Sequence, residues 1–186
     1  MDAIMIALVA VALANADGRT GAFLSDLLTR RSDRRAVVLL LFGSFIANAL
    51  VAAVMGAIAN RMIGQGIVAL LVAVALLSAA VAVAWRDRGD PAADWADAPP
   101  ALLGGRMLIG QFGDRSHFLI GALAATSGAG VWAAAGGFVG WVLAMLPFLA
   151  FGSTLRDSRA ARIIRWAGVA ILTLWAIRTA MGAFGL

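Results

Sequence analysis

Long apolar stretches separated by short polar ones dominate the pattern of this chain. They lie at about 3–29, 36–59, 62–85, 101–126, 131–154 and 163–184. Each approaches or exceeds the roughly 20 residues that an α-helix needs to cross a bilayer. The pattern therefore predicts an all-α membrane protein with about six transmembrane helices, whose boundaries are defined to within a few residues.

One segment cannot belong to any of these helices. Residues 86–100 combine arginine, aspartate, glycine and proline, which is typical of a linker and not of a membrane span. This linker divides the chain into a first unit, residues 1–85, and a second unit, residues 101–186. Each unit contains three of the predicted helices.

The two units carry related polar motifs inside their first apolar segment. The first reads N-A-D-G-R-T at residues 15–20, and the second reads Q-F-G-D-R-S at residues 111–116. With three helices in each unit, the second copy would enter the membrane from the opposite side. The sequence thus predicts two inverted three-helix repeats, an arrangement that places transport sites at the repeat interface near the bilayer midplane.

Composition strengthens the membrane assignment. The chain is 62% hydrophobic and 13% charged, against roughly 45–50% and 25% in soluble domains. All its basic side chains are arginines and all its acidic ones are aspartates, and the absence of cysteine excludes disulfides and thiolate metal sites. We expect the lipid bilayer as the main partner and no nucleic acid, because the arginines cluster at the ends of apolar segments.

The arginines also predict an orientation. Short cytoplasmic loops are enriched in basic residues, and three predicted loops share this enrichment: Arg30, Arg31, Arg34 and Arg35 in the first, Arg86 and Arg88 in the linker, and Arg156, Arg159, Arg162 and Arg165 in the third. The opposite side has Arg61 and, near the end of the last helix, Arg178. We therefore expect a multi-pass inner-membrane protein with a cytoplasmic linker and both termini outside.

The motifs themselves contain the candidate chemistry. A charged side chain near the bilayer centre costs at least about 2.5–3.5 kcal/mol, so paired Asp and Arg residues there need a reason. Gln111 and Asp114 are three residues apart and would share one face of a regular helix, with Ser116 farther round and Gly113 permitting close helix packing. Their oxygens suit a hard divalent cation. The alternative is structural: Asp17, Asp114 and the neighbouring arginines would only pair with each other or across the repeats.

At this point the sequence resembles a known family. G-D-R-S at residues 113–116, followed by an Ala-rich helix, and R-T at residues 19–20 resemble the signature E-x-G-D-[KR]-[ST] of the Gdt-type cation/proton exchangers. That family belongs to the LysE transporter superfamily and carries its signature twice. The resemblance implies transport of calcium or manganese in exchange for protons, with no bound cofactor other than the transported cation.

The resemblance extends to individual positions and also has departures. Gly113, Asp114, Arg115, Ser116, Arg19 and Thr20 match the signature, whereas Asn15 and Gln111 replace its glutamates and the order of its Gly-Asp pair is reversed at Asp17 and Gly18. If helix geometry is regular, Asp17 points about 100° away from the position of the missing carboxylate; a local break at Gly18 would turn it back. The implied cation site consists of Asp114, Gln111, Ser116, Asp17, Asn15 and Thr20, with Arg19 and Arg115 balancing charge.

Other polar residues have two readings each. His117 is either a proton relay or cation ligand, or else a packing residue, and Asn48 either contributes to the pathway or bonds to a neighbouring helix. No nucleotide-binding loop, Ser/His/Asp arrangement or His/Cys metal motif indicates an enzyme. The leading hypothesis is a manganese or calcium transporter coupled to protons. The alternatives are a non-transporting, degenerate membrane subunit and a LysE-like exporter of another small solute; whether the chain forms a homodimer stays open.

Overall fold

The computed structural model describes residues 2–85 and 92–185, and nearly all of them are helical. In chain order the elements are α1 (Asp2–Ala14), α2 (Arg19–Arg30), α3 (Arg34–Met62), α4 (Gln65–Ala84), the short 3-10 helix η1 (Ala92–Trp95), α5 (Pro100–Gln111), α6 (Arg115–Ser127), α7 (Gly130–Phe151), the 3-10 helix η2 (Ser153–Asp157) and α8 (Arg159–Ala183). The linker arginines Arg86 and Arg88 and the aspartates Asp87 and Asp90 lie outside the described residues.

Four of the described helices are long and apolar enough to cross a membrane, namely α3, α4, α7 and α8. A fifth crossing is possible if α1 and α2, which are bent by 70° at their junction, act together as one broken span. The all-helical, membrane-compatible architecture predicted from the sequence is therefore confirmed. The predicted segment at 101–126 is instead divided between α5 and α6, of 12 and 13 residues. Each is shorter than the roughly 20 residues of a full span.

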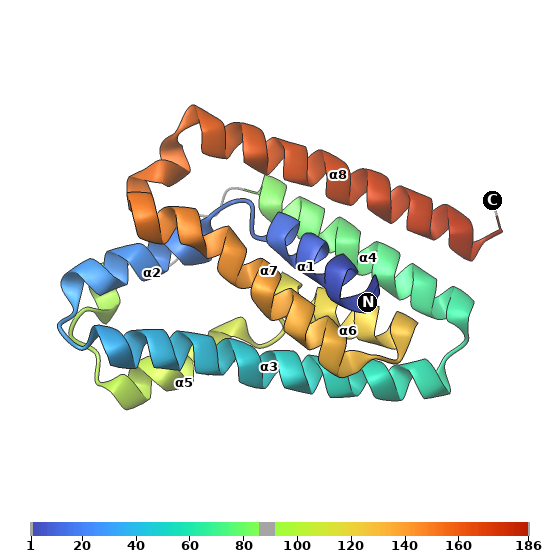
Figure 1. The fold of residues 1–186 in the computed structure, drawn as a ribbon, viewed down its shortest axis with the longest axis horizontal. Helices are drawn as coiled ribbons and strands as arrows, with labels where there is room; N and C mark the ends of the chain where they lie inside the picture. Colours follow the sequence, from blue (N-terminus) through green and yellow to red (C-terminus); the bar gives the residue numbers. More distant parts are fainter. Residues whose placement is uncertain (1, 86–91, 186) are drawn as a thin grey trace.

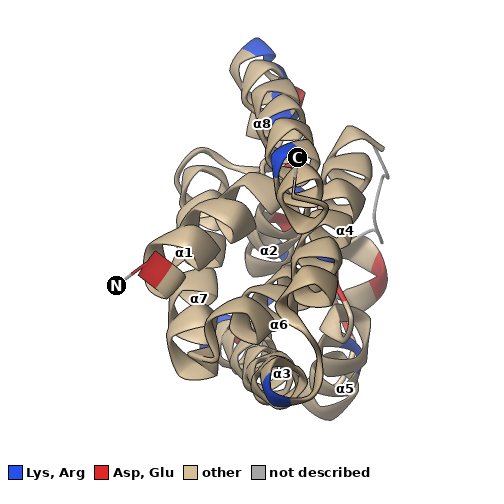
Figure 2. Cartoon of the chain, turned by 90° about the vertical axis from the view of Figure 1, so that its right-hand side faces the viewer, with Lys and Arg blue, Asp and Glu red and all other residues tan. Residues whose placement is uncertain are grey.

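The helices lie mostly side by side along the long direction of the molecule (Figure 1). The α2–α3 and α7–α8 connections lie at its left-hand end in this view. The chain termini, the α3–α4 connection and the α6–α7 connection lie toward its right. Charged residues occupy little of the ribbon (Figure 2). Because the α2–α3 and α7–α8 connections contain the described arginines of the basic loops, these arginines lie toward the left-hand end in Figure 1.

Helices of each unit pack against helices of the other unit, and we call these the exchanged contacts. Helix α7 of the second unit contacts both α1 and α2, while α3 of the first unit contacts both α5 and α6. Helix α4 packs along α8, the last helix of the other unit. Each broken pair of helices is therefore held by a long helix of the other unit.

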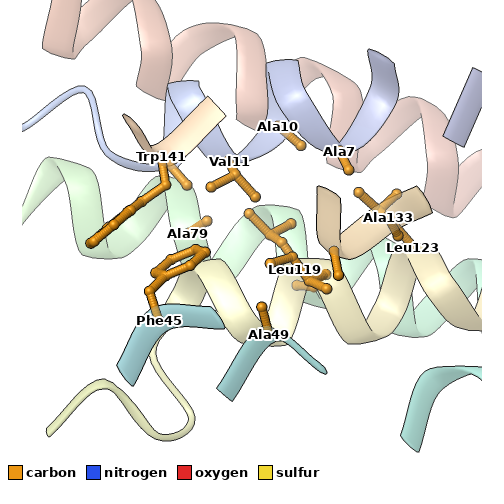
Figure 3. Packing of buried hydrophobic residues seen from close by; sticks show 14 of the residues in the cluster. Ala7, Ala10, Val11, Phe45, Ala49, Ala79, Leu119, Leu123, Ala133 and Trp141 are labelled. Carbon is orange, nitrogen blue, oxygen red and sulfur yellow. The ribbon is translucent and has the colours of Figure 1, made fainter. Parts of the chain in front are cut away.

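Small residues allow the helices to approach closely. A Cβ atom added to Gly136 or Gly140 of α7 would overlap the carbonyl oxygen of Ile4 or Leu8 in α1. Larger side chains fill the centre, where the Trp141 and Phe45 rings stack with their centroids 4.1 Å apart (Figure 3). Such backbone contact through glycine is typical of membrane helices.

A buried arginine fastens the end of α2 to the linker. The Arg31 guanidinium binds both carboxylate oxygens of Asp33 at 2.7 Å and donates to the backbone oxygens of Trp95, Ala96 and Ala98. This hydrogen-bonded pairing lowers the pKa of Asp33 below its ordinary value. The sequence indicates only a topological role for Arg31, because nothing in it shows that the linker folds back onto this side chain.

Candidate functional site

Both polar motifs form breaks between helices. The first break separates α1 from α2 and contains Gly18, whose φ is +66°; the second separates α5 from α6 and contains Gly113, whose φ is +73°. Glycine adopts this left-handed conformation at little cost because it has no Cβ atom. The glycine of each motif therefore makes the break possible, although the two occupy different places in the motif.

The two breaks meet inside the protein. Asn15 donates through Nδ2 to the Ser116 hydroxyl at 2.9 Å, and Arg115 Nη2 binds the Asp17 carboxylate at 2.7 Å. The side chains of this ion pair are only 10% and 7% exposed. The motifs, almost a hundred residues apart in sequence, thus form one polar cluster between the two units.

Further hydrogen bonds hold Asp17 in this cluster. Its carboxylate also accepts the backbone N–H of Arg19 at 3.3 Å, and its carbonyl oxygen accepts Nε of Arg156 at 3.2 Å. Of the two geometries considered for Asp17, a regular helix or a local break at Gly18, the structure has the break. The break directs the Asp17 carboxylate to Arg115. This geometry matches the cross-repeat pairing that was the structural alternative for Asp17.

Gln111 and Asp114 do not share a face of one helix, which corrects the expectation from their spacing. Gln111 is the last residue of α5, and Asp114 follows the break as the N-cap of α6, with an extended ψ of 154°. Gly113 between them has no atom within 4 Å of an added Cβ, so its role is the turn and not close packing. The broken helix still brings both side chains to one cavity.

This lateral cavity has a volume of about 1150 Å³ and is bounded by α2, α4, η1, α5 and the start of α6. Gln111, Asp114 and Arg115 contribute to it from the second motif, and Arg19 and Thr20 from the first. Asp17, Asn15 and Ser116 are not among its lining residues. The predicted site residues are thus divided between a buried cluster and a cavity wall, with Arg115 taking part in both.

Two buried amide oxygens stand out because they have no hydrogen-bond partner. They are Oδ1 of Asn15 and Oε1 of Gln111, which occupy equivalent positions in the two motifs. A buried polar atom without a partner costs about 1–3 kcal/mol, so such atoms favour binding of an ordered water or an ion. Carbonyl-type oxygens of this kind bind hard cations.

The two breaks differ in what surrounds them. A Cβ atom at Gly18 would overlap the ring of Phe148 from α7, whereas the space beside Gly113 is open. Phe148 therefore fills the place that a side chain at position 18 would occupy. No signal in the sequence singles out Phe148, because it lies 130 residues after Gly18 in an unremarkable apolar run. The contact of Arg156 with Asp17 was not expected either, because the sequence indicates Arg156 only as a loop arginine.

The remaining polar candidates are structural in their contacts. His117 Nε2 lies 3.2 Å from the Phe45 carbonyl oxygen, and its ring packs 4.6 Å from the Phe45 ring. Asn48 donates to the carbonyl oxygen of Leu108 at 2.9 Å, bridging α3 and α5. Both residues therefore join neighbouring helices.

Acidic and histidine side chains alone do not form a metal site here. Within residues 2–85 and 92–185, no three of them come together in a way that could hold an ion. A cation bound at the breaks would therefore need the amide and hydroxyl oxygens of the motifs in addition to Asp114.

No protein-family model matches the chain, and comparisons with curated proteins and with solved structures found no significant match. The fold and site by themselves define a class: an all-helical protein with several helices able to span a membrane, and with two helix breaks that meet in a buried polar cluster.

Proposed function

We propose that the protein is a secondary transporter that exchanges a divalent cation, manganese or calcium, for protons across the inner membrane. The observation that carries this proposal is the pair of unpartnered amide oxygens, Asn15 Oδ1 and Gln111 Oε1, one in each helix break. They stand where the resembled family has glutamates. Both keep a neutral oxygen ligand at that position.

Asp114 supplies the negative charge in this proposal. Asp17 is neutralised by Arg115, whereas the Asp114 carboxylate makes no capping bond to α6 and lies in the wall of the lateral cavity. One carboxylate with amide and hydroxyl oxygens is a suitable set for a hard cation. With Ser116 completing the set, the cation would sit at the second break and Asn15 would extend the site toward the first.

The proposed framework has six crossings in two inverted three-helix repeats, with α1–α2 and α5–α6 as broken spans. The exchanged contacts support it, because α7 holds the first broken pair and α3 holds the second. Broken helices around a central site are a recurring plan of secondary transporters. The basic connections at one end support a cytoplasmic linker with both termini outside.

Transport into liposomes tests the proposal. We expect the purified, reconstituted protein to take up Mn²⁺ or Ca²⁺ when a pH gradient is imposed, and Asp114→Asn to abolish that uptake because the site loses its carboxylate. Asp94→Asn removes the same charge from the exposed face of η1 and should leave uptake unchanged. If the wild-type protein moves neither ion, the exchanger proposal is wrong.

A second candidate function is a non-transporting membrane subunit. Two observations favour it: Phe148 fills the space beside Gly18, and Arg115 holds Asp17 in a buried ion pair. Both would stabilise a fold whose coupling has been lost. The liposome assay separates the two candidates, since a subunit of this kind would fold and reconstitute without carrying any flux.

A further inference from the structure

One wall of the lateral cavity is apolar and faces away from the protein core. Val74, Leu77 and Val81 of α4 line it, and they are 55%, 48% and 55% exposed. Because α4 is among the helices able to span a membrane, these side chains lie where lipid chains would surround the protein. With α4 spanning a membrane, this wall of the cavity would face the acyl chains.

The other wall of the cavity is basic. Four arginines line it, Arg19, Arg106, Arg115 and Arg156, together with the two aspartates Asp26 and Asp114, and Arg115 is also paired with Asp17 outside the cavity. Arginine has five N–H donors, so each can keep a carboxylate partner and still bind a phosphate oxygen. The Arg115 Nε is buried and has no partner, which leaves a donor at this wall for an anionic ligand.

Tryptophans stand beside an arginine at one end of the cavity. The Arg106 guanidinium stacks over the Trp95 ring at 4.0 Å, and Trp85 follows the end of α4 and lines the same cavity. Tryptophan favours the membrane–water interface, where its ring is partly solvated. The cavity thus runs from an interfacial, basic end to an apolar wall, which is the polarity profile of a phospholipid.

We propose that the lateral cavity binds an acidic phospholipid, with its phosphate on Arg106 and the neighbouring arginines and its acyl chains along Val74, Leu77 and Val81. Basic pockets between membrane helices are known to bind anionic headgroups. The excess of arginine over aspartate in the lining disfavours zwitterionic headgroups, which carry a positive charge of their own. A soluble anion would use the arginines but not the apolar wall. The proposal needs the protein to be in a membrane and does not require that it transports ions.

Thermal unfolding in detergent tests the proposal with defined probes. Short-chain phosphatidylglycerol should raise the unfolding midpoint, whereas phosphatidylcholine of the same chain length and glycerol phosphate should raise it much less. An equal response to phosphatidylcholine would indicate binding through the chains alone, and an equal response to glycerol phosphate would indicate a site for free anions. Either result would overturn the proposal.

Two variants locate the binding to this cavity. Arg106→Gln should reduce the response to phosphatidylglycerol several-fold, while Arg178→Gln, an equal charge change on the exposed surface of α8, should leave it intact. Leu77→Trp fills the apolar wall without altering charge and should also reduce the response, which keeps the test informative if Arg106→Gln folds poorly. A response unaffected by Arg106→Gln and Leu77→Trp would contradict the assignment.

Native mass spectrometry gives an independent readout of the occupant. We expect the wild-type protein to carry adducts with the mass of phosphatidylglycerol, and Arg106→Gln to lose them. A dimer without bound lipid would show that a second copy of the chain covers the cavity, and the proposal would fail.

Discussion

Replacing Arg115 with methionine is expected to destabilise the protein by about 3–5 kcal/mol, because it leaves the Asp17 carboxylate buried without its charge partner. The two groups are 2.7 Å apart and nearly excluded from solvent. Urea or thermal unfolding of the purified protein in detergent measures the loss. Arg61→Met, which removes an exposed arginine at the end of α3, should have little effect.

The double variant shows whether the ion pair is responsible. Asp17→Asn combined with Arg115→Met removes both charges, so it should be more stable than Arg115→Met alone. If the two changes are simply additive, Asp17 and Arg115 do not interact in the folded protein, and the two breaks do not meet through this pair.

Gly18→Ala is expected to be far more destabilising than Gly113→Ala. Both glycines have positive φ, so an alanine costs roughly 1–2 kcal/mol of backbone strain at either position. Only at Gly18 does the added Cβ overlap the Phe148 ring, which adds a further cost of about 1–3 kcal/mol from overpacking. Unfolding measurements on the two single variants give the difference directly.

Phe148→Ala provides the matching test. In the Gly18→Ala background, shortening Phe148 should recover part of the lost stability, whereas Phe148→Ala in the wild-type background should destabilise by creating a cavity. Recovery would place the Phe148 ring beside the break. Equal destabilisation by Phe148→Ala in both backgrounds would rule out this contact.

The sequence was sufficient to predict an all-helical chain with several apolar helices and the positions of the two polar motifs. Hydrophobic runs indicate the helices, and the glycine and charged residues of each motif stand out because these residue types do not continue an apolar helix without cost. A break was expected only as one possibility at Gly18, and none was expected at the second motif. The boundaries of α3, α4 and α7 also follow the apolar runs closely.

The geometry within the motifs could not be predicted in the same way. The expectation that Gln111 and Asp114 share a face assumed a continuous helix, yet the turn at Gly113 separates them. The partners of Asp17 depend on how the two units dock, which local sequence does not encode. The position of Phe148 beside Gly18 is likewise a tertiary contact between distant segments.

The motifs are consequently unequal in structure as well as in sequence. The second break opens on the lateral cavity and contributes Asp114, while the first is filled by Phe148 and its aspartate is paired. The first motif therefore contributes to the proposed cation site through the unpartnered oxygen of Asn15 and through Thr20, which lines the cavity. If Asn15 contributes, the cation site is shared by the two breaks; if it does not, the site is confined to the second break.

Direct binding of Mn²⁺ to the purified protein, followed by the loss of the signal of free Mn²⁺ in electron paramagnetic resonance, tests this shared site. We predict saturable binding that is weakened at least tenfold by Asp114→Asn and also weakened by Asn15→Ala, but not by Asp94→Asn. Absence of saturable binding, or binding that does not respond to either Asp114→Asn or Asn15→Ala, would contradict a cation site formed where the two breaks meet.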